Sequence, residues 1–453
     1  MANSRNVISP LDDRYGKDLE ELDGWFSEFA LTRYRILIEI EYLIALGRLK
    51  GVTQLPPFST SQRYELRTLY GDFSRRQFLA VKRAENRTQH DVKAVEYFLR
   101  HQLQRMGFGR VTEWIHYGLT SEDVNNLAYG LMWKDAVKRV YLPTLTKLVT
   151  RLKNLARRYR DVSLLALTHG QPATPTSLGK ELAVFASRLT RQRRQLKAHQ
   201  LQGKLSGATG TWSAHAASYP NVHWINFSKN FVSSLGLEPN VLTTQVESHD
   251  SLAESYHILI RINTVLLDFC RDVWHYISRG ILRQKPGAGE VGSSTMPHKV
   301  NPIRFENAEG NLGIAIRYLS HLAQTLPVSR LQRDLSGSTV IRNQGVPLAH
   351  SLLALKNVLK GLEGISVNRE RIRQELNNHW EVLGEAIQTV LRKTGDKKAY
   401  ERLMIITRGQ KVPREKIHAF IKELDLPEDE KTRLLALTPE SYTGLASKVV
   451  EEM

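Results

Sequence analysis

The sequence has a single cysteine, Cys270, among its 453 residues. One cysteine cannot form an intramolecular disulfide or a cysteine-rich zinc site, so cysteine usage predicts a reducing compartment, the cytoplasm. No stretch approaches the roughly 18 consecutive apolar residues that span a bilayer, and the first 16 residues lack the apolar core of a signal peptide. We therefore expect neither export nor membrane insertion.

Glycine and proline are also few, with 29 and 16 residues, which excludes collagen-like and low-complexity proteins. No tandem repeat with a period of about 20 to 50 residues is found, so a solenoid is excluded. The period-two alternation typical of strands is confined to short pieces such as residues 241–246. These absences predict an all-α fold.

The sequence is rich instead in long segments without glycine or proline. The clearest covers residues 249–279, where apolar residues recur at three- and four-residue steps and predict one long helix. The same periodicity predicts helices over residues 142–155, 178–196 and 311–326. Four long helices indicate a central helical bundle.

Shorter helical patterns lie on either side of the predicted bundle. The early part is broken by glycines and prolines, and the late part is charge-rich, with short helical units around prolines. We therefore predict an N-terminal helical domain over residues 1–111, a central bundle domain over 112–366 and a C-terminal helical domain over 367–453.

Positive charge exceeds negative charge, with 64 Lys and Arg against 46 Asp and Glu and a net charge of +18. Such a surplus attracts polyanions. Nucleic acid, an acidic membrane surface and a small substrate with phosphate and carboxylates all fit, and only the local arrangement of residues distinguishes them.

Residues 287–292 match the letters G-x-G-x-x-G, but no predicted strand precedes them and no helix opens after them. A dinucleotide site requires both, so a glycine-rich loop is favoured over a nucleotide cofactor site. The loop continues over residues 292–302 as GSSTMPHKVNP, with hydroxyls, a lysine and an asparagine. Such a loop is suited to close over an anion, although its composition also fits a solvated linker.

Three other polar clusters are candidates for chemistry. Residues 168–175, THGQPATP, place a histidine in a turn, where it can supply a proton or serve only as a structural hydrogen-bonding residue. The pair His90 and Asp91, and the sequence TSED over 120–123, resemble helix N-termini, which also bind phosphate or carboxylate. In the segment 329–342, Arg333 and Arg342 lie on either side of Ser338, which suits a phosphate clamp or a solvated connection.

The motif at residues 292–302 resembles the signature loop of the fumarase/aspartase superfamily of lyases. Together with the motifs at 168–174 and 120–123 and the early pair Arg14 and Tyr15, it makes nearly the whole chain similar to the bacterial adenylosuccinate lyase family. This resemblance implies a three-domain fold with a central long-helix bundle. It also implies a homotetramer whose active sites each draw residues from three subunits.

The resemblance further implies a reaction and its substrates, which are phosphorylated dicarboxylates. Family members eliminate fumarate from adenylosuccinate, giving AMP, and from succinylaminoimidazole carboxamide ribotide, giving AICAR. They use no metal and no redox cofactor. The expected chemistry is an acid/base β-elimination in purine biosynthesis, with no membrane and no specific nucleic acid as partner.

The same resemblance assigns roles to residues of this chain. It implies that Ser293 is the general base and His169 the general acid, and that Lys299, Asn301 and His90 assist catalysis. The implied substrate-binding residues are Arg14, Tyr15, Gln89, His90, Asp91, Thr120, Ser121, Gln245, Ser294, Lys299, Asn301, Asn307, Arg333, Ser338 and Arg342.

Two alternatives remain open from the sequence. A related lyase that acts on argininosuccinate, malate or aspartate would share the serine loop, but malate or aspartate would make no use of a phosphate clamp at Arg333 and Arg342. A catalytically inactive helical protein that binds nucleic acid would account for the basic charge and would show a steep salt dependence of binding.

Overall fold

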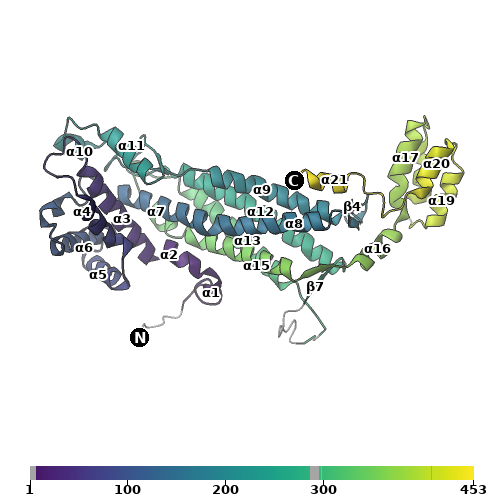
Figure 1. Ribbon diagram of the computed structural model, residues 1–453, viewed down its shortest axis with the longest axis horizontal. Coiled ribbons are helices and arrows are strands. Elements are labelled where there is room, and N and C mark those ends of the chain that lie inside the picture. Colours follow the sequence, from purple (N-terminus) through teal and green to yellow (C-terminus); the bar gives the residue numbers. More distant parts are fainter. Residues whose placement is uncertain (1–6, 286–294, 297, 410) are drawn as a thin grey trace. The chain divides into compact units, whose positions relative to one another are not determined.

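The computed structural model describes residues 7–285, 295–296, 298–409 and 411–453. Within them the chain is mainly helical (Figure 1) and forms two compact units. The first unit consists of Met1–Thr144, Gln192–Thr264 and Gly310–Ala354, and the second of Leu145–Arg191, Val265–Glu309 and Leu355–Met453.

Most of the described helices lie within one of the two units. Those within the first unit are α1 (Gly16–Leu19), η1 (Glu20–Leu22), α2 (Asp23–Phe26), α3 (Glu28–Leu46), α4 (Thr60–Gly71), α5 (Arg75–Thr88), α6 (Asp91–Arg105), η2 (Gly109–Trp114), α7 (Ser121–Ala136), the π-helical η3 (Val137–Tyr141), α10 (Ser213–Ser218), α11 (Trp224–Ser234) and α14 (Ser336–Ile341). Those within the second are α16 (Arg369–Asn377), η4 (Trp380–Leu383), α17 (Gly384–Lys393), α18 (Ala399–Thr407), α19 (Arg414–Lys422), α20 (Glu428–Ala436) and α21 (Ala446–Glu451).

Other helices contribute residues to both units. They are α8 (Leu142–Arg158), α9 (Leu178–Ala198), α12 (Asp250–Ser278), α13 (Ile303–Thr325) and α15 (Gly345–Glu363). The long helix predicted over 249–279 is α12, and the apolar stripe that predicts it is buried, for example at Leu259, Ile262 and Leu266. The helices predicted over 142–155 and 178–196 are α8 and α9.

Polar and aromatic contacts show that these helices pack as a bundle. In the first unit Arg261 of α12 donates to Gln192 of α9 at 2.8 Å, and His350 of α15 lies 2.8 Å from Asn311 of α13. In the second unit the ring of Phe269 on α12 contacts Phe185 of α9 and Phe305 of α13. The predicted bundle is confirmed.

One local prediction differs from the structure, and a second feature agrees with it. Helix α13 begins at Ile303, eight residues before the predicted start, because Pro302 lies just ahead of its first turn, where a missing N–H costs no hydrogen bond. Residues 241–246 form no strand, since their alternation belongs to an irregular segment before α12.

Strands are short and occur in pairs. The antiparallel pairs are β1 (Ser163–Leu164) with β4 (Thr176–Ser177), β2 (Leu167–Thr168) with β3 (Gln171–Pro172), and β7 (Leu282–Gln284) with β8 (Ile365–Val367), and the parallel pair is β5 (Gln202–Gly203) with β6 (Glu238–Pro239). These strand pairs join the connecting segments between helices and form no larger β-sheet within the described residues.

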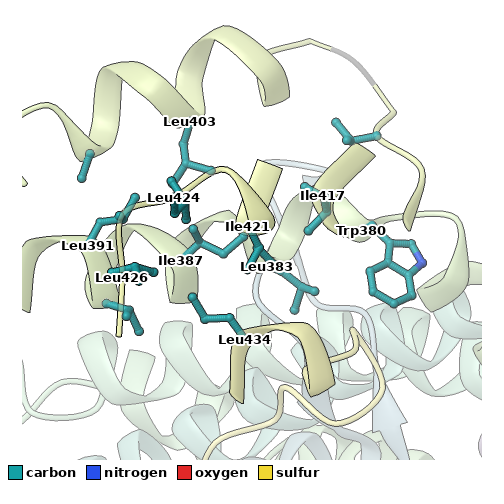
Figure 2. Packing of buried hydrophobic residues seen from close by; sticks show 13 residues of the cluster. Trp380, Leu383, Ile387, Leu391, Leu403, Ile417, Ile421, Leu424, Leu426 and Leu434 are labelled. Carbon is teal, nitrogen blue, oxygen red and sulfur yellow. The ribbon is translucent and has the colours of Figure 1, made fainter. Parts of the chain in front are cut away.

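The C-terminal helices of the second unit have a hydrophobic core of their own (Figure 2). Ile417 and Ile421 of α19 are fully buried there, and they pack in one core with the buried Ile387 of α17 and Leu403 of α18. The residues of α19 that enter this core are four apart, which places them on one face of the helix. Among the described residues, no helix combines the length and the apolarity needed to cross a membrane.

Candidate active site

A cleft in the first unit has a volume of about 940 Å³. Its walls come from α5, α6, α7, the segment before α12 and the segment from the end of α13 through α14. Eight of the predicted substrate-binding residues line it: Gln89, His90, Asp91, Ser121, Gln245, Arg333, Ser338 and Arg342. Three motifs that are far apart in the sequence therefore meet at one cleft.

The turn between α5 and α6 presents His90 and Asp91 to this cleft. Gln89 has a left-handed backbone conformation (φ 53°), and His90 then caps α6 by accepting a hydrogen bond at Nδ1 from the N–H of Lys93 at 3.2 Å. A neutral ring that accepts at Nδ1 carries its proton on Nε2. The histidine predicted at a helix N-terminus is thus oriented by that terminus.

Asp91 joins two arginines at the cleft wall. Its Oδ2 accepts from Arg35 at 2.7 Å and from Arg342 at 2.6 Å, and Arg342 also donates to Glu28 at 2.9 Å. Burial acts to raise the pKa of Asp91, but the two guanidiniums outweigh it and hold that pKa well below its usual range. Asp91 therefore stays ionised and fixes the direction of Arg342.

Arg333 is held from two sides. Its Nη1 donates to the side-chain oxygen of Gln245 at 3.0 Å, and its Nη2 lies 3.6 Å from Oε2 of Glu122. Glu122 is buried, and burial raises its pKa to about 7 even though Arg333 and Lys204 act to lower it. The two cleft arginines are thus each paired with a carboxylate of the protein.

The N-terminus of α7 forms another part of the wall. Thr120 and Asp123 make the reciprocal capping box that the TSED sequence predicts, with the Thr120 N–H donating to Asp123 at 2.9 Å. Ser121 lies in the first turn, where free N–H groups favour an anion. Thr120 itself lies beside the cleft lining as the helix cap.

The other predicted residues lie elsewhere in the chain. Arg14 and Tyr15 precede α1 in the first unit, where the Arg14 guanidinium stacks on the Tyr15 ring, and neither lines the cleft. The second unit contains His169, Lys299, Asn301 and Asn307. Ser293 and Ser294 lie outside the described residues.

His169 occupies the tight turn between β2 and β3, with a left-handed backbone (φ 54°). It does not cap α9, which begins at Leu178. The turn is closed by the pairing of Thr168 with Gln171, so the imidazole projects from a short hairpin. Asn307 on α13 accepts a hydrogen bond from Asn357 at 2.9 Å.

Several cleft residues have no role in the sequence-based prediction. Glu28, Lys82, Glu85, Glu122 and His249 all line the cleft. One signal for this region is present in α3, where the buried, charged Arg35 interrupts a run of apolar residues. Such a residue requires a partner, and its partner is the cleft residue Asp91.

The fold and the sequence define a class of protein. The profile of a family described as Lyase matches residues 50–316. Two solved structures share the fold, each with a TM-score of 0.76. The fumarate lyase from Mesorhizobium sp. BNC1 is 18% identical, with 96% of this chain and 97% of that chain covered. The 3-carboxy-cis,cis-muconate lactonizing enzyme from Pseudomonas putida is 24% identical, with 98% of each chain covered. The chain thus has the fold of the fumarase/aspartase lyases.

The particular family follows from more similar sequences. A profile described as Adenylosuccinate lyase C-terminal matches residues 329–443. The adenylosuccinate lyase from Escherichia coli K12 is 47% identical over 452 residues, which cover 100% of this chain and 99% of that protein. The adenylosuccinate lyase from Haemophilus influenzae is 46% identical over 448 residues, which cover 99% of this chain and 98% of that protein. The chain belongs to the adenylosuccinate lyase family, and the predicted lyase activity and helical fold are confirmed. The domain boundaries at 111 and 366 stay predictions.

Proposed function

We propose that this lyase eliminates fumarate from adenylosuccinate to give AMP, and from succinylaminoimidazole carboxamide ribotide to give AICAR. The observation that carries this proposal is that Arg333, Ser338 and Arg342 line one cleft together with His90 and Asp91. Both substrates carry a phosphate and two carboxylates, so a cleft with two fixed guanidiniums suits them.

Phosphate binding is assigned to the segment that contains α14. Arg333 and Arg342 flank Ser338 there, and all three reach the cleft. The guanidiniums are held by Gln245 and Asp91, so little side-chain freedom is lost when an anion binds. Arg14 and Tyr15, which the family resemblance also assigns to the substrate, would have to approach the phosphate from outside the described cleft lining.

The chemical step is assigned by family resemblance. His169 protonates the leaving nitrogen, and Ser293 removes the proton from the succinyl carbon next to a carboxylate. The carbanion spreads its charge into that carboxylate, where Lys299 and Asn301 stabilise it. Since no redox change occurs, the residues need only supply and accept protons and support charge.

Assembly completes the proposal. The protein is a homotetramer in the cytoplasm, and each active site draws residues from three subunits. Such sharing would let the cleft of the first unit in one subunit be completed by His169 and the Ser293 loop of others.

Ultraviolet-monitored cleavage of adenylosuccinate, with a chelator present, tests the proposal. We expect fumarate and AMP as products, and we expect both His169→Ala and Ser293→Ala to abolish turnover without unfolding the chain. His223→Ala, at an exposed histidine outside the cleft lining, is the matched control and keeps wild-type rates. Turnover of argininosuccinate or malate in place of adenylosuccinate would reject the proposal.

A second pair of variants tests the phosphate assignment. Arg333→Ala is expected to raise KM for adenylosuccinate by at least about tenfold, because a charge-assisted contact with the phosphate is lost. Arg330→Ala, three residues away with an 81% exposed side chain, is expected to leave KM unchanged. Equal KM values for the two variants would remove Arg333 from the phosphate site.

A further inference from the structure

Arg333 is incompletely satisfied in the described structure. Two of its terminal N–H groups face Gln245 and Glu122, but its Nε is buried and has no hydrogen-bond partner among the described residues. A buried donor without an acceptor costs about 1 to 3 kcal/mol. The guanidinium is therefore held in a position in which one donor, at Nε, stays unsatisfied by the described residues.

The groups that hold Arg333 are themselves fixed. The side chain of Gln245 donates through Nε2 to the carbonyl of Ala208 at 2.8 Å. The main-chain carbonyl of Gln245 accepts from the buried Lys204 at 2.8 Å. Glu122 lies in the first turn of α7, next to the capped Asp123. The position of the guanidinium thus depends on one neutral amide and one carboxylate.

The carboxylate of Glu122 has an unusual environment. The residue is only 6% exposed and lines the cleft. The charged groups around it are Arg333, Lys204 on the segment after β5, and Arg35 on α3, with Asp123 on its own helix. Burial is the largest influence and raises the pKa of Glu122 to about 7. The other titratable side chains that line the same cleft are Glu28, Lys82, Glu85, His90, Asp91, Tyr129, His249, Asp334 and Arg342.

We propose that Glu122 is a positioning residue that holds Arg333 through its carboxylate when no anion is bound and takes up a proton when a phosphate dianion binds Arg333. This inference rests on the proposed function only in the assignment of Arg333 to the phosphate. The proton comes from solvent and converts the carboxylate to a carboxylic acid. A neutral carboxyl group removes the repulsion between two anions that share one guanidinium and can donate its own hydrogen bond.

Phosphate affinity then depends on pH in a defined direction. Below the pKa of Glu122 the carboxyl group is already protonated, and binding requires no proton. Above it each binding event takes up a proton, so affinity falls by up to about tenfold for each pH unit. A glutamine at this position has no charge to lose, and its affinity for the phosphate stays level over this range.

Calorimetric titration with AMP tests this coupling. Wild type and Glu122→Gln are titrated from about pH 6.5 to 8.5, each in two buffers of different ionisation enthalpy. We expect proton uptake by wild type at about pH 7.5 and a larger value than for Glu122→Gln. We also expect wild-type affinity to fall relative to the variant by about tenfold across the range. Ionisation of AMP itself is common to both proteins and cancels in the comparison.

Glu96→Gln is the matched control, because Glu96 is a buried carboxylate on α6 that pairs with Lys93 and Arg100 and does not line the cleft. It should show wild-type proton uptake.

Glu122→Ala tests positioning, since it removes the side chain that holds Arg333, and it should weaken AMP binding at every pH, unlike the glutamine variant.

The outcomes separate the inference from the proposed function. If Arg333→Ala leaves the affinity for AMP unchanged, Arg333 does not bind the phosphate, and both the phosphate assignment and the inference are overturned. A second outcome is that Arg333→Ala lowers AMP affinity but wild type and Glu122→Gln show the same proton uptake and the same pH dependence. That outcome overturns the inference and leaves the proposed function in place. Wild-type proton uptake is measured without any variant, so a glutamine variant that fails to fold still leaves a decisive result: no uptake overturns the inference.

Discussion

The ammonium group of Lys204 lies 3.0 Å from Oδ1 of Asp123, and neither side chain has any exposed surface. The same ammonium group donates to the carbonyls of Gly207 and Gln245 at 2.9 and 2.8 Å. Asp123 in turn completes the capping box of α7 by accepting a hydrogen bond from the N–H of Thr120. One buried ion pair therefore fixes both the helix terminus and the segment that presents Gln245 to the cleft.

Replacing Lys204 by methionine should destabilise the fold strongly. Removal of one partner leaves the Asp123 charge buried without compensation, which costs about 3 to 5 kcal/mol. Urea unfolding measures the change. Arg271→Met, which breaks the exposed 2.8 Å pair with Glu309, is the control and should cost less than about 1 kcal/mol. Similar losses in the two variants would contradict this reading of the buried pair.

His215 should make stability depend on pH. Its Nε2 lies 2.8 Å from the Tyr42 hydroxyl, which donates to the carbonyl of Tyr117, so the ring donates at Nε2 and its buried Nδ1 has no hydrogen-bond partner among the described residues. Burial lowers the pKa of His215 from 6.5 to about 4, and the nearby Asp123 only partly opposes this. A folded chain that binds the proton less readily than the unfolded chain is most stable above pH 6.5.

The free energy of unfolding is therefore expected to lose about 3 kcal/mol through His215 as the pH falls from 6.5 to 4. Urea titrations of wild type and His215→Gln at several pH values measure it, and the variant should show a flatter dependence. His101→Gln, at an exposed histidine, should keep the wild-type slope. Parallel curves for wild type and His215→Gln would refute the assignment.

A methyl group added at Gly118 should be costly. Its backbone is left-handed (φ 69°), and a Cβ there would lie 2.7 Å from Nε2 of His215. Gly107 is also left-handed (φ 82°), but a Cβ there meets nothing within 4 Å. Gly107→Ala should cost about 1 to 2 kcal/mol from backbone strain alone, and Gly118→Ala should cost more, because His215 must also move. Equal midpoints in urea would show that the imidazole yields without cost.

Much of this architecture is readable from the sequence. The long apolar stripe of α12 and the capping sequence that starts α7 depend on local spacing, which a single chain displays directly. Family resemblance predicts that Gln89, His90, Arg333 and Arg342 bind the substrate, and all four line one cleft in the structure.

Other features depend on contacts that the sequence does not encode locally. Glu122 resembles an ordinary acidic residue in a first helical turn, and only its burial against Arg333, 211 positions later, distinguishes it. Lys204 lies between Gly203 and Leu205, and nothing in this local sequence names a partner for its charge. It is fully buried because Asp123, 81 positions earlier, lies in contact with it. Pairings of distant residues such as these require the fold itself.

Mixing two impaired variants tests whether active sites are shared between subunits. His169→Ala removes the proposed acid of the second unit, and Arg333→Ala removes the proposed phosphate ligand of the first. If each site takes these residues from different subunits, random reassembly of a one-to-one mixture restores both in about a quarter of the sites. The measurement is adenylosuccinate cleavage after the two purified variants are dissociated together and reassembled. Each variant carried alone through the same treatment is the control, assayed at a substrate concentration well below the raised KM of Arg333→Ala, and should stay far less active than wild type. A mixture no more active than these controls would mean that one subunit supplies both residues, because no site in it could then contain an intact pair.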